Sequence, residues 1–256
     1  MRVASWNVNS IRTRVDQTVT WAVDHRADVM LLQETKCGDH DFPFDAFADA
    51  GFEVAHHGVD HWNGVAIISR VGIDDVQRGF TGPQKPPFDE PRLIAATCGG
   101  LRVWSVYVPN GRELDDPHYL AKLVWLERLR GELALVDAAA GCSVVAGDFN
   151  VAPADLDIYD PKRWRRRTHA SAPERDGIRH LVDLGLIDIA RDRHPDSHEF
   201  TWWNYRPGQF DRDAGLRIDL ALCSVDVARR VDRVWVDRAA RAHERPSDHA
   251  PLVLDL

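Results

Sequence analysis

Carboxylate and amide side chains follow several short apolar runs that lie far apart in this chain. In chain order these residues are Asn7, Glu34, Asp148, Asn150 and Asp219, and Asp248 and His249 follow near the end. Such apolar runs are typical of buried strands, and α/β sheets collect ligand-binding groups at their strand ends. Oxygen ligands suit a hard divalent cation such as Mg²⁺, which assists phosphoester hydrolysis. The set predicts a metal-dependent phosphodiesterase, although each acid taken singly also fits a turn or a helix cap.

Chemical type separates these residues into metal ligands and proton-handling groups. Glu34 is the leading candidate Mg²⁺ ligand, followed by Asp248 and Asn7, and the alternative for Glu34 is a salt bridge with Lys36. Asp148 and Asn150 alternate on extended backbone, so both side chains would face the same site. His249 is suited to donate to a phosphate oxygen or to act as a base, and a carboxylate on its other nitrogen would raise its pKa.

The elements that must position these residues alternate between strands and helices along the chain. Strands are expected at 3–6, 29–32, 93–97, 101–108, 201–203, 218–222, 231–236 and 251–256, in the run into Asp148, and as a hairpin within 52–68 around Asn63-Gly64. Helical spacing links Val15 to Val23 and Leu120 to Val136, and Gly141 is placed to end the second helix. A capping box at Ser171–Glu174 begins a third helix. We expect one α/β domain over residues 1–256, with two stacked sheets and helices outside.

Composition favours a soluble globular protein. The hydrophobic fraction of 44% excludes general disorder, and no apolar stretch is long enough to span a bilayer. We expect the mature chain to begin near Met1, since no secretory signal follows it, and four scattered cysteines fit a reducing, cytoplasmic setting. The net charge of −8 argues mildly against nucleic-acid binding, but the stretch Lys162 to Arg167 carries five positive charges in six residues. That stretch would give DNA a local basic surface, or it is a solvated loop.

Six segments of the chain resemble the exonuclease III family of apurinic/apyrimidinic endonucleases, bacterial type. They are Ser5–Arg12, Leu32–Lys36, Tyr107–Gly111, Gly147–Asn150, Arg217–Asp219 and Ser247–Pro251. The resemblance implies a four-layer α/β sandwich of two stacked mixed β-sheets flanked by helices, as in endonuclease/exonuclease/phosphatase enzymes. It also implies a Mg²⁺-dependent enzyme, with Mn²⁺ as an alternative metal. Such an enzyme cuts duplex DNA 5′ to abasic sites and has 3′-5′ exodeoxyribonuclease and 3′-end-trimming activity.

The resemblance also assigns roles to individual residues. It implies that Tyr107, Asp148, Asn150, Asp219 and His249 are catalytic, and it adds Asp148 and Asn150 to the metal-binding set of Asn7, Glu34 and Asp248. By the same likeness, Asn110 contacts phosphate and Trp202 lines a pocket for the base-free sugar, which a normal nucleotide would not fit. Arg92 and Arg165 are expected to contact the DNA backbone. The acid and base roles of Asp148 and His249 stay open.

Two other functions are compatible with parts of the pattern. The same metal and Asp/His core would serve an enzyme acting on inositol phosphates, sphingomyelin or general DNA, and a catalytically silent binding module would keep the fold. Trp202-Trp203 and residues 107–110 favour the DNA repair enzyme. Asn9 stands where some family members carry an acid, which leaves the number of metals open. We expect a monomer that acts on double-stranded DNA with abasic sites or blocked 3′ ends, away from membranes.

Overall fold

Two six-stranded sheets stack face to face in the computed structural model, which describes residues 1–83, 85 and 88–256. The first sheet has the order β11-β12-β1-β2-β4-β3 and the second has the order β5-β6-β7-β8-β10-β9. The strands of the first sheet are β1 (Arg2–Asn7), β2 (Val29–Gln33), β3 (Glu53–His57), β4 (Val65–Ser69), β11 (Arg233–Val236) and β12 (Leu252–Asp255). Those of the second are β5 (Asp74–Arg78), β6 (Leu93–Cys98), β7 (Leu101–Tyr107), β8 (Ser143–Asp148), β9 (Ile187–Asp188) and β10 (Asp219–Cys223).

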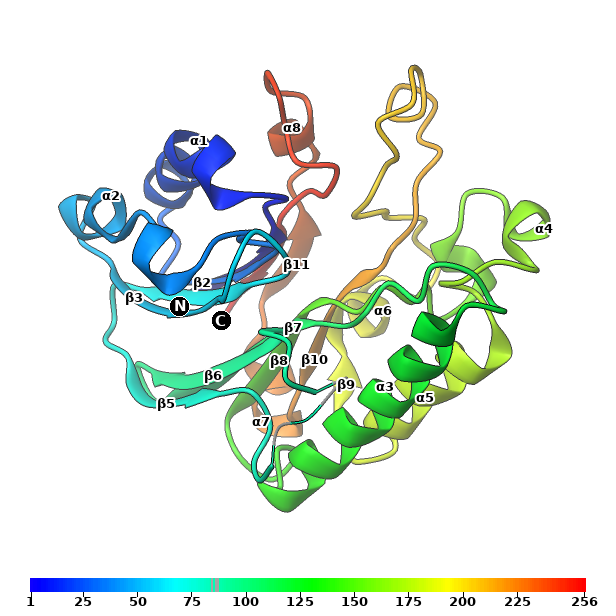
Figure 1. Ribbon diagram of the computed structural model, residues 1–256, viewed down its shortest axis with the longest axis horizontal. Helices are drawn as coiled ribbons and strands as arrows, with labels where there is room; N and C mark the ends of the chain where they lie inside the picture. Colours follow the sequence, from blue (N-terminus) through cyan, green and yellow to red (C-terminus); the bar gives the residue numbers. More distant parts are fainter. Residues whose placement is uncertain (84, 86–87) are drawn as a thin grey trace.

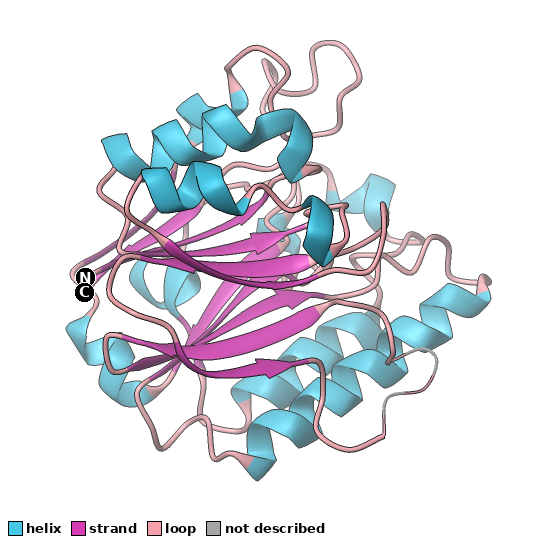
Figure 2. Ribbon diagram, turned by 60° about the vertical axis from the view of Figure 1, so that its left-hand side comes forward, coloured by secondary structure: helices cyan, strands magenta, loops and turns pink. Residues whose placement is uncertain are grey.

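Helices cover the outer face of each sheet, which gives the four layers seen in Figures 1 and 2. The helices are α1 (Ile11–Asp24), α2 (Phe44–Asp49), α3 (Pro117–Leu135), α4 (Pro161–Trp164), α5 (Ala172–Val182), α6 (Ile189–Arg193), α7 (Val225–Arg230) and α8 (Arg238–Arg241). One apolar cluster joins α1 and α2 to the first sheet, and another joins α3 and α5 to the second. A third cluster fills the space between the sheets. The predicted fold class is confirmed.

Continuous apolar runs form the central strands because these strands are covered on both faces. Every residue of β2, β4 and β8 is buried. Val29 and Leu31 of β2 face the inter-sheet cluster, whereas Met30 and Leu32 face the helices. The two-residue alternation of side chains thus supplies both cores from one strand.

The central pair of strands in each sheet is parallel, and the other pairs are antiparallel. β1 pairs with β2 across α1, and β7 pairs with β8 across α3. Parallel neighbours require a crossover connection of this kind, and it brings their carboxyl ends to one edge. β10 and β12 run antiparallel to β8 and β1, so the residues at their amino ends reach that same edge.

Three details of the sequence-based prediction are wrong. Residues 201–203 form no strand: Trp202 makes only isolated bridges, to Leu216 and to His249, because its segment bonds two different loops instead of one continuous ladder. The long helix α3 ends at Leu135 rather than near Gly141, since Val136 already caps it through backbone bonds.

The outer edge of α3 also differs from the expected apolar stripe. Leu120 is 65% exposed and Val136 is 47% exposed, whereas Lys122 is fully buried. The helix therefore turns a lysine, rather than a leucine, toward the interior at its first turns.

The predicted hairpins are confirmed. β3 pairs with β4 around Asn63-Gly64, and β6 pairs with β7 around Gly99-Gly100. The irregular loop expected from Gly82 to Pro91 includes residues 84, 86 and 87, which lie outside the described residues. Across the part of the chain that is described, no helix has both the length and the apolar character to cross a membrane.

Candidate active site

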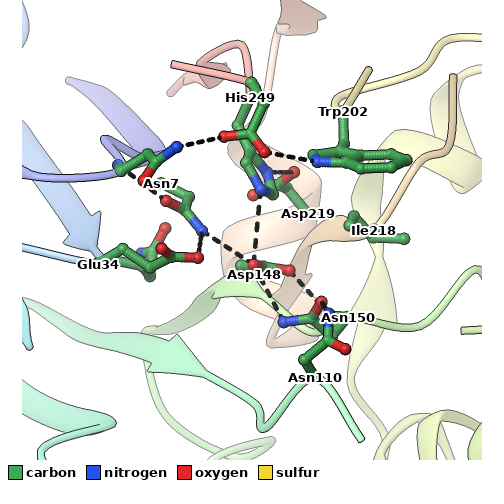
Figure 3. A network of polar contacts seen from close by, with 12 residues as sticks. Asn7, Glu34, Asn110, Asp148, Asn150, Trp202, Ile218, Asp219 and His249 are labelled. Carbon is green, nitrogen blue, oxygen red and sulfur yellow. Dashed lines mark hydrogen bonds and ion pairs between the residues drawn. The ribbon is translucent and has the colours of Figure 1, made fainter. Parts of the chain in front are cut away.

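Side chains from both sheets meet where the two parallel strand pairs end. Asn7 ends β1 and Glu34 follows β2, while Tyr107 ends β7 and Asp148 ends β8. Asp219 begins β10 directly opposite Asp148 in the strand register. Figure 3 shows Asn7, Glu34, Asp148, Asp219 and His249 facing one another across this edge. The predicted convergence of distant polar residues is therefore observed.

Asp148 lies at the centre of the cluster and is 1% exposed. Its Oδ2 accepts from the Asn7 amide at 3.0 Å and from the Asn150 amide at 3.1 Å, and its Oδ1 accepts from the Asn150 backbone N–H at 2.9 Å. Burial raises the pKa of Asp148 to about 7, against the opposing effect of the nearby His249. A carboxyl group with such a pKa exchanges a proton readily near neutral pH.

His249 is held between two carboxylates. Its Nδ1 lies 2.8 Å from Asp219 Oδ2, and its Nε2 lies 3.7 Å from Asp148 Oδ2. Burial alone would lower the pKa of His249, but Asp219 and Asp148 outweigh burial and raise it to about 10. The imidazole is consequently a cation with its Nδ1–H bound to Asp219, and its Nε2–H faces the centre of the site.

A strained loop carries Glu34. Glu34 has φ 54° and Lys36 has φ 52°, both in the left-handed region that non-glycine residues rarely occupy. The loop is clamped by backbone bonds from Thr35 to Gly64 and from Lys36 to Asn63, the turn of the β3–β4 hairpin. A Cβ on Gly64 would lie 2.0 Å from Thr35 Oγ1, so only glycine permits this approach. The hairpin turn thus fixes the direction of the Glu34 side chain.

The Glu34 carboxylate is ionised and faces two donors. Oε1 accepts from the Asn7 amide at 2.8 Å, and Oε2 lies 2.7 Å from Lys36 Nζ. Burial favours a higher pKa for Glu34, but Lys36 and Asn7 outweigh it and bring the pKa below its ordinary value. Glu34 therefore lies at the shared edge and also forms the salt bridge with Lys36 that the sequence suggested as the alternative.

The residues present fit a divalent cation. Carboxylate oxygens of Glu34 and Asp148 lie within 4.8 Å of each other and of a His249 ring nitrogen. Asp219 Oδ1 is buried and has no hydrogen-bond partner among the residues described. The carboxylates at this edge supply the hard oxygen ligands that Mg²⁺ prefers, and a cation held by few protein ligands leaves room for water and a phosphate.

Asp248 and Trp202 form the rim beside His249. The Trp202 indole donates to Asp248 Oδ2 at 3.0 Å, and the Asn9 amide donates to Asp248 Oδ1 at 3.0 Å. Asn9 also accepts from Lys36 at 2.5 Å, so a polar chain links Asp248 to the Glu34 loop. The side-chain Oδ1 of Asn7 accepts from the Asn9 backbone N–H, which leaves the side-chain NH2 of Asn7 turned toward the carboxylates.

Tyr107 and Asn110 border the opposite side of Asp148. The Asn110 amide donates to Asn150 Oδ1 at 3.1 Å.

Burial, reinforced by the charge of Glu34, raises the pKa of Tyr107 well above its ordinary value, so its hydroxyl stays protonated. The Arg92 guanidinium lies 4.5 Å from the centroid of the Tyr107 ring and pairs with Glu90, which places Arg92 beside Tyr107.

The predicted basic stretch lies next to Asn110. Arg165 follows α4 and is exposed. Arg166 and Arg167 line a cavity of about 850 Å³ together with Asn110, Trp164 and His169. Trp164 packs edge-on against Trp202 at 6.4 Å between ring centroids, which joins this cavity to the Trp202 side of the site.

Sequence reasoning missed several residues that hold the site in place. Lys122 donates to the backbone of Asn110 and Asn150, and Thr201 Oγ1 accepts from the backbone of Asp219. A signal for Lys122 was present in the sequence, because it precedes Leu126, Leu129 and Leu133 at the spacing of one helix face. The Thr201 contact joins distant loops and leaves no periodic pattern.

Comparisons with known proteins agree with this geometry. A model of the Endonuclease/Exonuclease/phosphatase family matches residues 4–249. Exodeoxyribonuclease III of Haemophilus influenzae is 33% identical to this chain, with 98% of each chain covered. Among solved structures, the 3′-5′ exonuclease NExo of Neisseria meningitidis is 41% identical, with a TM-score of 0.96 over 100% of this chain and 99% of that one.

Two further structures extend the likeness to DNA and to abasic-site enzymes. A 3′ phosphatase NExo from Neisseria bound to a product DNA hairpin is 40% identical, with a TM-score of 0.96 and coverage of 100% and 99%. An AP endonuclease from Archaeoglobus fulgidus is 35% identical, with the same TM-score and the same coverage. The expected resemblance is confirmed, and this chain belongs to the endonuclease/exonuclease/phosphatase family as an exonuclease III-type, metal-dependent hydrolase acting on DNA.

Proposed function

We propose that this protein is a Mg²⁺-dependent DNA repair phosphodiesterase that cuts duplex DNA 5′ to abasic sites and trims 3′ ends in the 3′-5′ direction. The observation that carries the proposal is the meeting of Glu34, Asp148 and the Asp219–His249 pair at one edge of two sheets. Relatives of 33–41% identity are named for exonuclease, 3′ phosphatase and AP endonuclease activities. Mn²⁺ is an alternative metal, and we propose that the enzyme works as a cytoplasmic monomer.

The chain's own residues divide the chemistry of phosphodiester hydrolysis. A divalent cation bound by Glu34 would neutralise charge on the scissile phosphate, with Asn7 and Asp248 as further candidate ligands and Asp148 and Asn150 as weaker ones. We assign Asp148 to take the proton of the attacking water, because its pKa of about 7 suits a base near neutral pH. His249, cationic and oriented by Asp219, donates from Nε2 to a phosphate oxygen.

Amide and hydroxyl groups around Asp148 orient the reacting atoms. Asn150 holds the attacking water beside Asp148, to which both its amide and its backbone N–H already donate. Tyr107 donates its hydroxyl to the phosphate, and Asn110 adds a second donor. These groups stabilise charge as it develops, without having to move during the reaction.

Substrate selection rests on the Trp202 side of the site. Trp202 stands beside His249 and is fixed by its bond to Asp248. A small apolar wall accepts a sugar that has lost its base and excludes a normal nucleotide. Arg165 and the neighbouring arginines contact the flanking DNA backbone, and Arg92 supports the site through Tyr107.

The proposal is tested with a panel of labelled substrates. The wild-type protein is incubated with an abasic duplex, an intact duplex with a recessed 3′ end, a duplex with a 3′ phosphate, and a soluble phosphoinositide. We expect incision 5′ to the abasic site and shortening of 3′ ends with Mg²⁺, and neither with EDTA. Asp148→Asn serves as the inactive control, since it keeps the shape of the side chain and removes the base.

Three results would contradict the proposal in whole or in part. Incision that persists undiminished in EDTA would exclude the metal-dependent chemistry. Faster turnover of the phosphoinositide than of any DNA would assign the same catalytic groups to another phosphoester. If the protein trims 3′ ends but does not cut at the abasic site, Trp202 does not line a pocket for the base-free sugar. The proposal would then hold only for the 3′-end activity.

A further inference from the structure

A fully buried lysine lies beneath two asparagines of the site. Lys122 is on α3 and has 0% exposure. It occupies the helix face that Leu126, Leu129 and Leu133 turn toward the second sheet. Burial of a lysine at a core position is costly unless its charge is paired and its donors are satisfied. The position therefore requires a reason other than packing.

The Lys122 ammonium reaches the backbone that carries the site amides. Its Nζ donates to Asn150 O at 2.7 Å and to Asn110 O at 3.2 Å. The side chains of these asparagines are joined to each other at 3.1 Å, and Asn150 donates onward to Asp148 at 3.1 Å. One ammonium thus fixes two loops whose asparagine side chains are bonded to each other, and Asn150 is bonded in turn to the Asp148 carboxylate.

Glu174, on the helix α5 that packs beside α3, forms an ion pair with that ammonium. Its Oε1 lies 2.5 Å from Lys122 Nζ and also accepts from Thr168 Oγ1 at 2.7 Å and from the His169 backbone N–H at 2.8 Å. Its Oε2 accepts from Ser171, with which Glu174 forms the capping box of α5. The carboxylate is therefore satisfied at both oxygens and anchored to the start of a helix.

The backbone of Asn150 needs this support. Asn150 has φ 52°, in the left-handed region, and its carbonyl accepts from Lys122 and from His169 Nδ1 at 2.5 Å. A strained residue keeps its conformation only when its surroundings fix it. The loop of Asn110 rests on the same lysine, because a Cβ on Gly111 would lie 3.0 Å from Lys122 Cδ.

We propose that Lys122 and Glu174 form a buried positioning pair that fixes Asn110 against Asn150 and Asn150 against Asp148. The pair rests on the proposed function, since it acts through residues assigned to that chemistry, and it contacts no reacting atom. Removing it should lower kcat more than it raises KM, because the misplaced amides serve the transition state rather than DNA binding. A methionine would fill the space of Lys122 and leave both asparagine carbonyls without this donor.

The experiment separates positioning from stability with three variants. Lys122→Met removes the ammonium but leaves Glu174 buried and charged, whereas Lys122→Met/Glu174→Gln removes both charges. Leu129→Ala is the matched control, because Leu129 is fully buried on the same helix and has no part in the site. Each variant is compared with the wild type in kcat, KM, melting temperature and amide hydrogen exchange of the metal-free protein.

We expect Lys122→Met to lower kcat by about 10- to 100-fold with KM within about threefold, as misplaced catalytic groups do. The double variant should regain much of the lost melting temperature, since no unpaired charge remains buried, but kcat should stay low. Leu129→Ala should melt at a lower temperature, with kcat within about twofold of the wild type. Exchange in residues 108–111 and 149–152 should speed up in both lysine variants and not in Leu129→Ala.

Recovery of kcat together with melting temperature in the double variant would reduce the pair to a structural role. Unchanged exchange in both segments would do the same, whatever the activity. If neither lysine variant folds, Gly111→Ala disturbs the loop side instead, because a Cβ at this residue of φ 86° would lie 2.9 Å from Thr168 Oγ1 and 3.0 Å from Lys122 Cδ. An unaltered kcat there would contradict the proposal. An inactive wild type would count against the proposed function, whereas the exchange experiment would still test the pair.

Discussion

The two sheets bring an acidic residue to the same edge in the same way, yet they give the two carboxylates opposite surroundings. β1-α1-β2 leads to Glu34, and β7-α3-β8 leads to Asp148. Glu34 has a 17% exposed side chain paired with Lys36, and the pKa of Glu34 lies below its ordinary value. Asp148 is 1% exposed, and burial raises its pKa to about 7.

This difference shows that topology places a carboxylate and its environment then decides what it does. A carboxylate that stays charged is suited to hold a cation. A carboxylate whose charge is disfavoured is suited to take and release a proton. Substitutions on the two sides of the site should therefore fail in different ways.

The largest effect is expected for Asp148→Asn. The amide takes no proton from water, so kcat should fall by about three to five orders of magnitude, while DNA binding stays largely intact. Single-turnover incision and a DNA titration in EDTA measure the two quantities. Near-normal turnover would remove Asp148 from its role as a base.

A smaller loss is expected for Asp219→Asn. The amide no longer stabilises the charged imidazole, so His249 loses both its orientation and the raised pKa, and kcat should fall by about 100- to 1,000-fold. Nitrogen-15 NMR of the His249 ring reads out the protonation state. An imidazole that remains charged at pH 8 in the variant would show that Asp219 does not set its pKa.

Glu34→Gln should act on metal affinity before it acts on chemistry. The neutral side chain keeps the geometry of the loop but loses a charged oxygen ligand, so Mn²⁺ should bind about ten- to a hundredfold more weakly. Electron paramagnetic resonance of free Mn²⁺ measures this without DNA. Asp248→Asn tests the next candidate ligand in the same way, and an equal loss there would place Asp248 in the ligand set beside Glu34.

The dependence of stability on pH should differ in sign between the two sides, in metal-free protein. The pKa of His249 is raised from 6.5 to about 10, so its stabilising contribution is complete below pH 6.5 and is lost as the pH rises toward 10. The pKa of Glu34 is lowered from 4.5, so its contribution is present above pH 4.5 and is lost as the pH falls.

Urea unfolding across this pH range checks both directions. In Asp219→Asn, the free energy of unfolding should fall less between pH 6.5 and 10 than it does in the wild type. In Glu34→Gln, it should fall less than in the wild type only below pH 4.5. Equal changes in the acid and the alkaline range in either variant would contradict the contrast between Glu34 and the Asp219–His249 pair.

Periodic features of the sequence were sufficient to predict most of the fold. Apolar runs such as Val29 to Leu32 are long enough to require cover on both faces, and Asn63-Gly64 marks its hairpin directly. The short strand β5 has mostly exposed residues, so no hydrophobic pattern in the sequence predicts it. Residues 201–203 have the composition of a strand, but their backbone partners lie in separate loops, which local sequence does not reveal.

The meeting of the site residues and the raised pKa of His249 could be predicted from the sequence, whereas the raised pKa of Asp148 could not. Strand order explains why Asp219 lies opposite Asp148, and the family motifs point to both. The pKa of Asp148 depends on how deeply it is buried beside His249, and the support from Lys122 depends on which face α3 turns inward. These are tertiary properties, and the sequence signal for Lys122 was outweighed by the neighbouring leucines.

A Mg²⁺ titration of single-turnover incision, run on Glu34→Gln and Asp148→Asn beside the wild type, tests the division between the two carboxylates most directly. We expect Glu34→Gln to need a higher Mg²⁺ concentration and to recover part of its rate when it is supplied. We expect Asp148→Asn to reach half of its maximal rate at a Mg²⁺ concentration close to that of the wild type. Its maximal rate should stay low, because excess Mg²⁺ does not restore it. The same shifted midpoint and the same recovery in both variants would contradict separate roles.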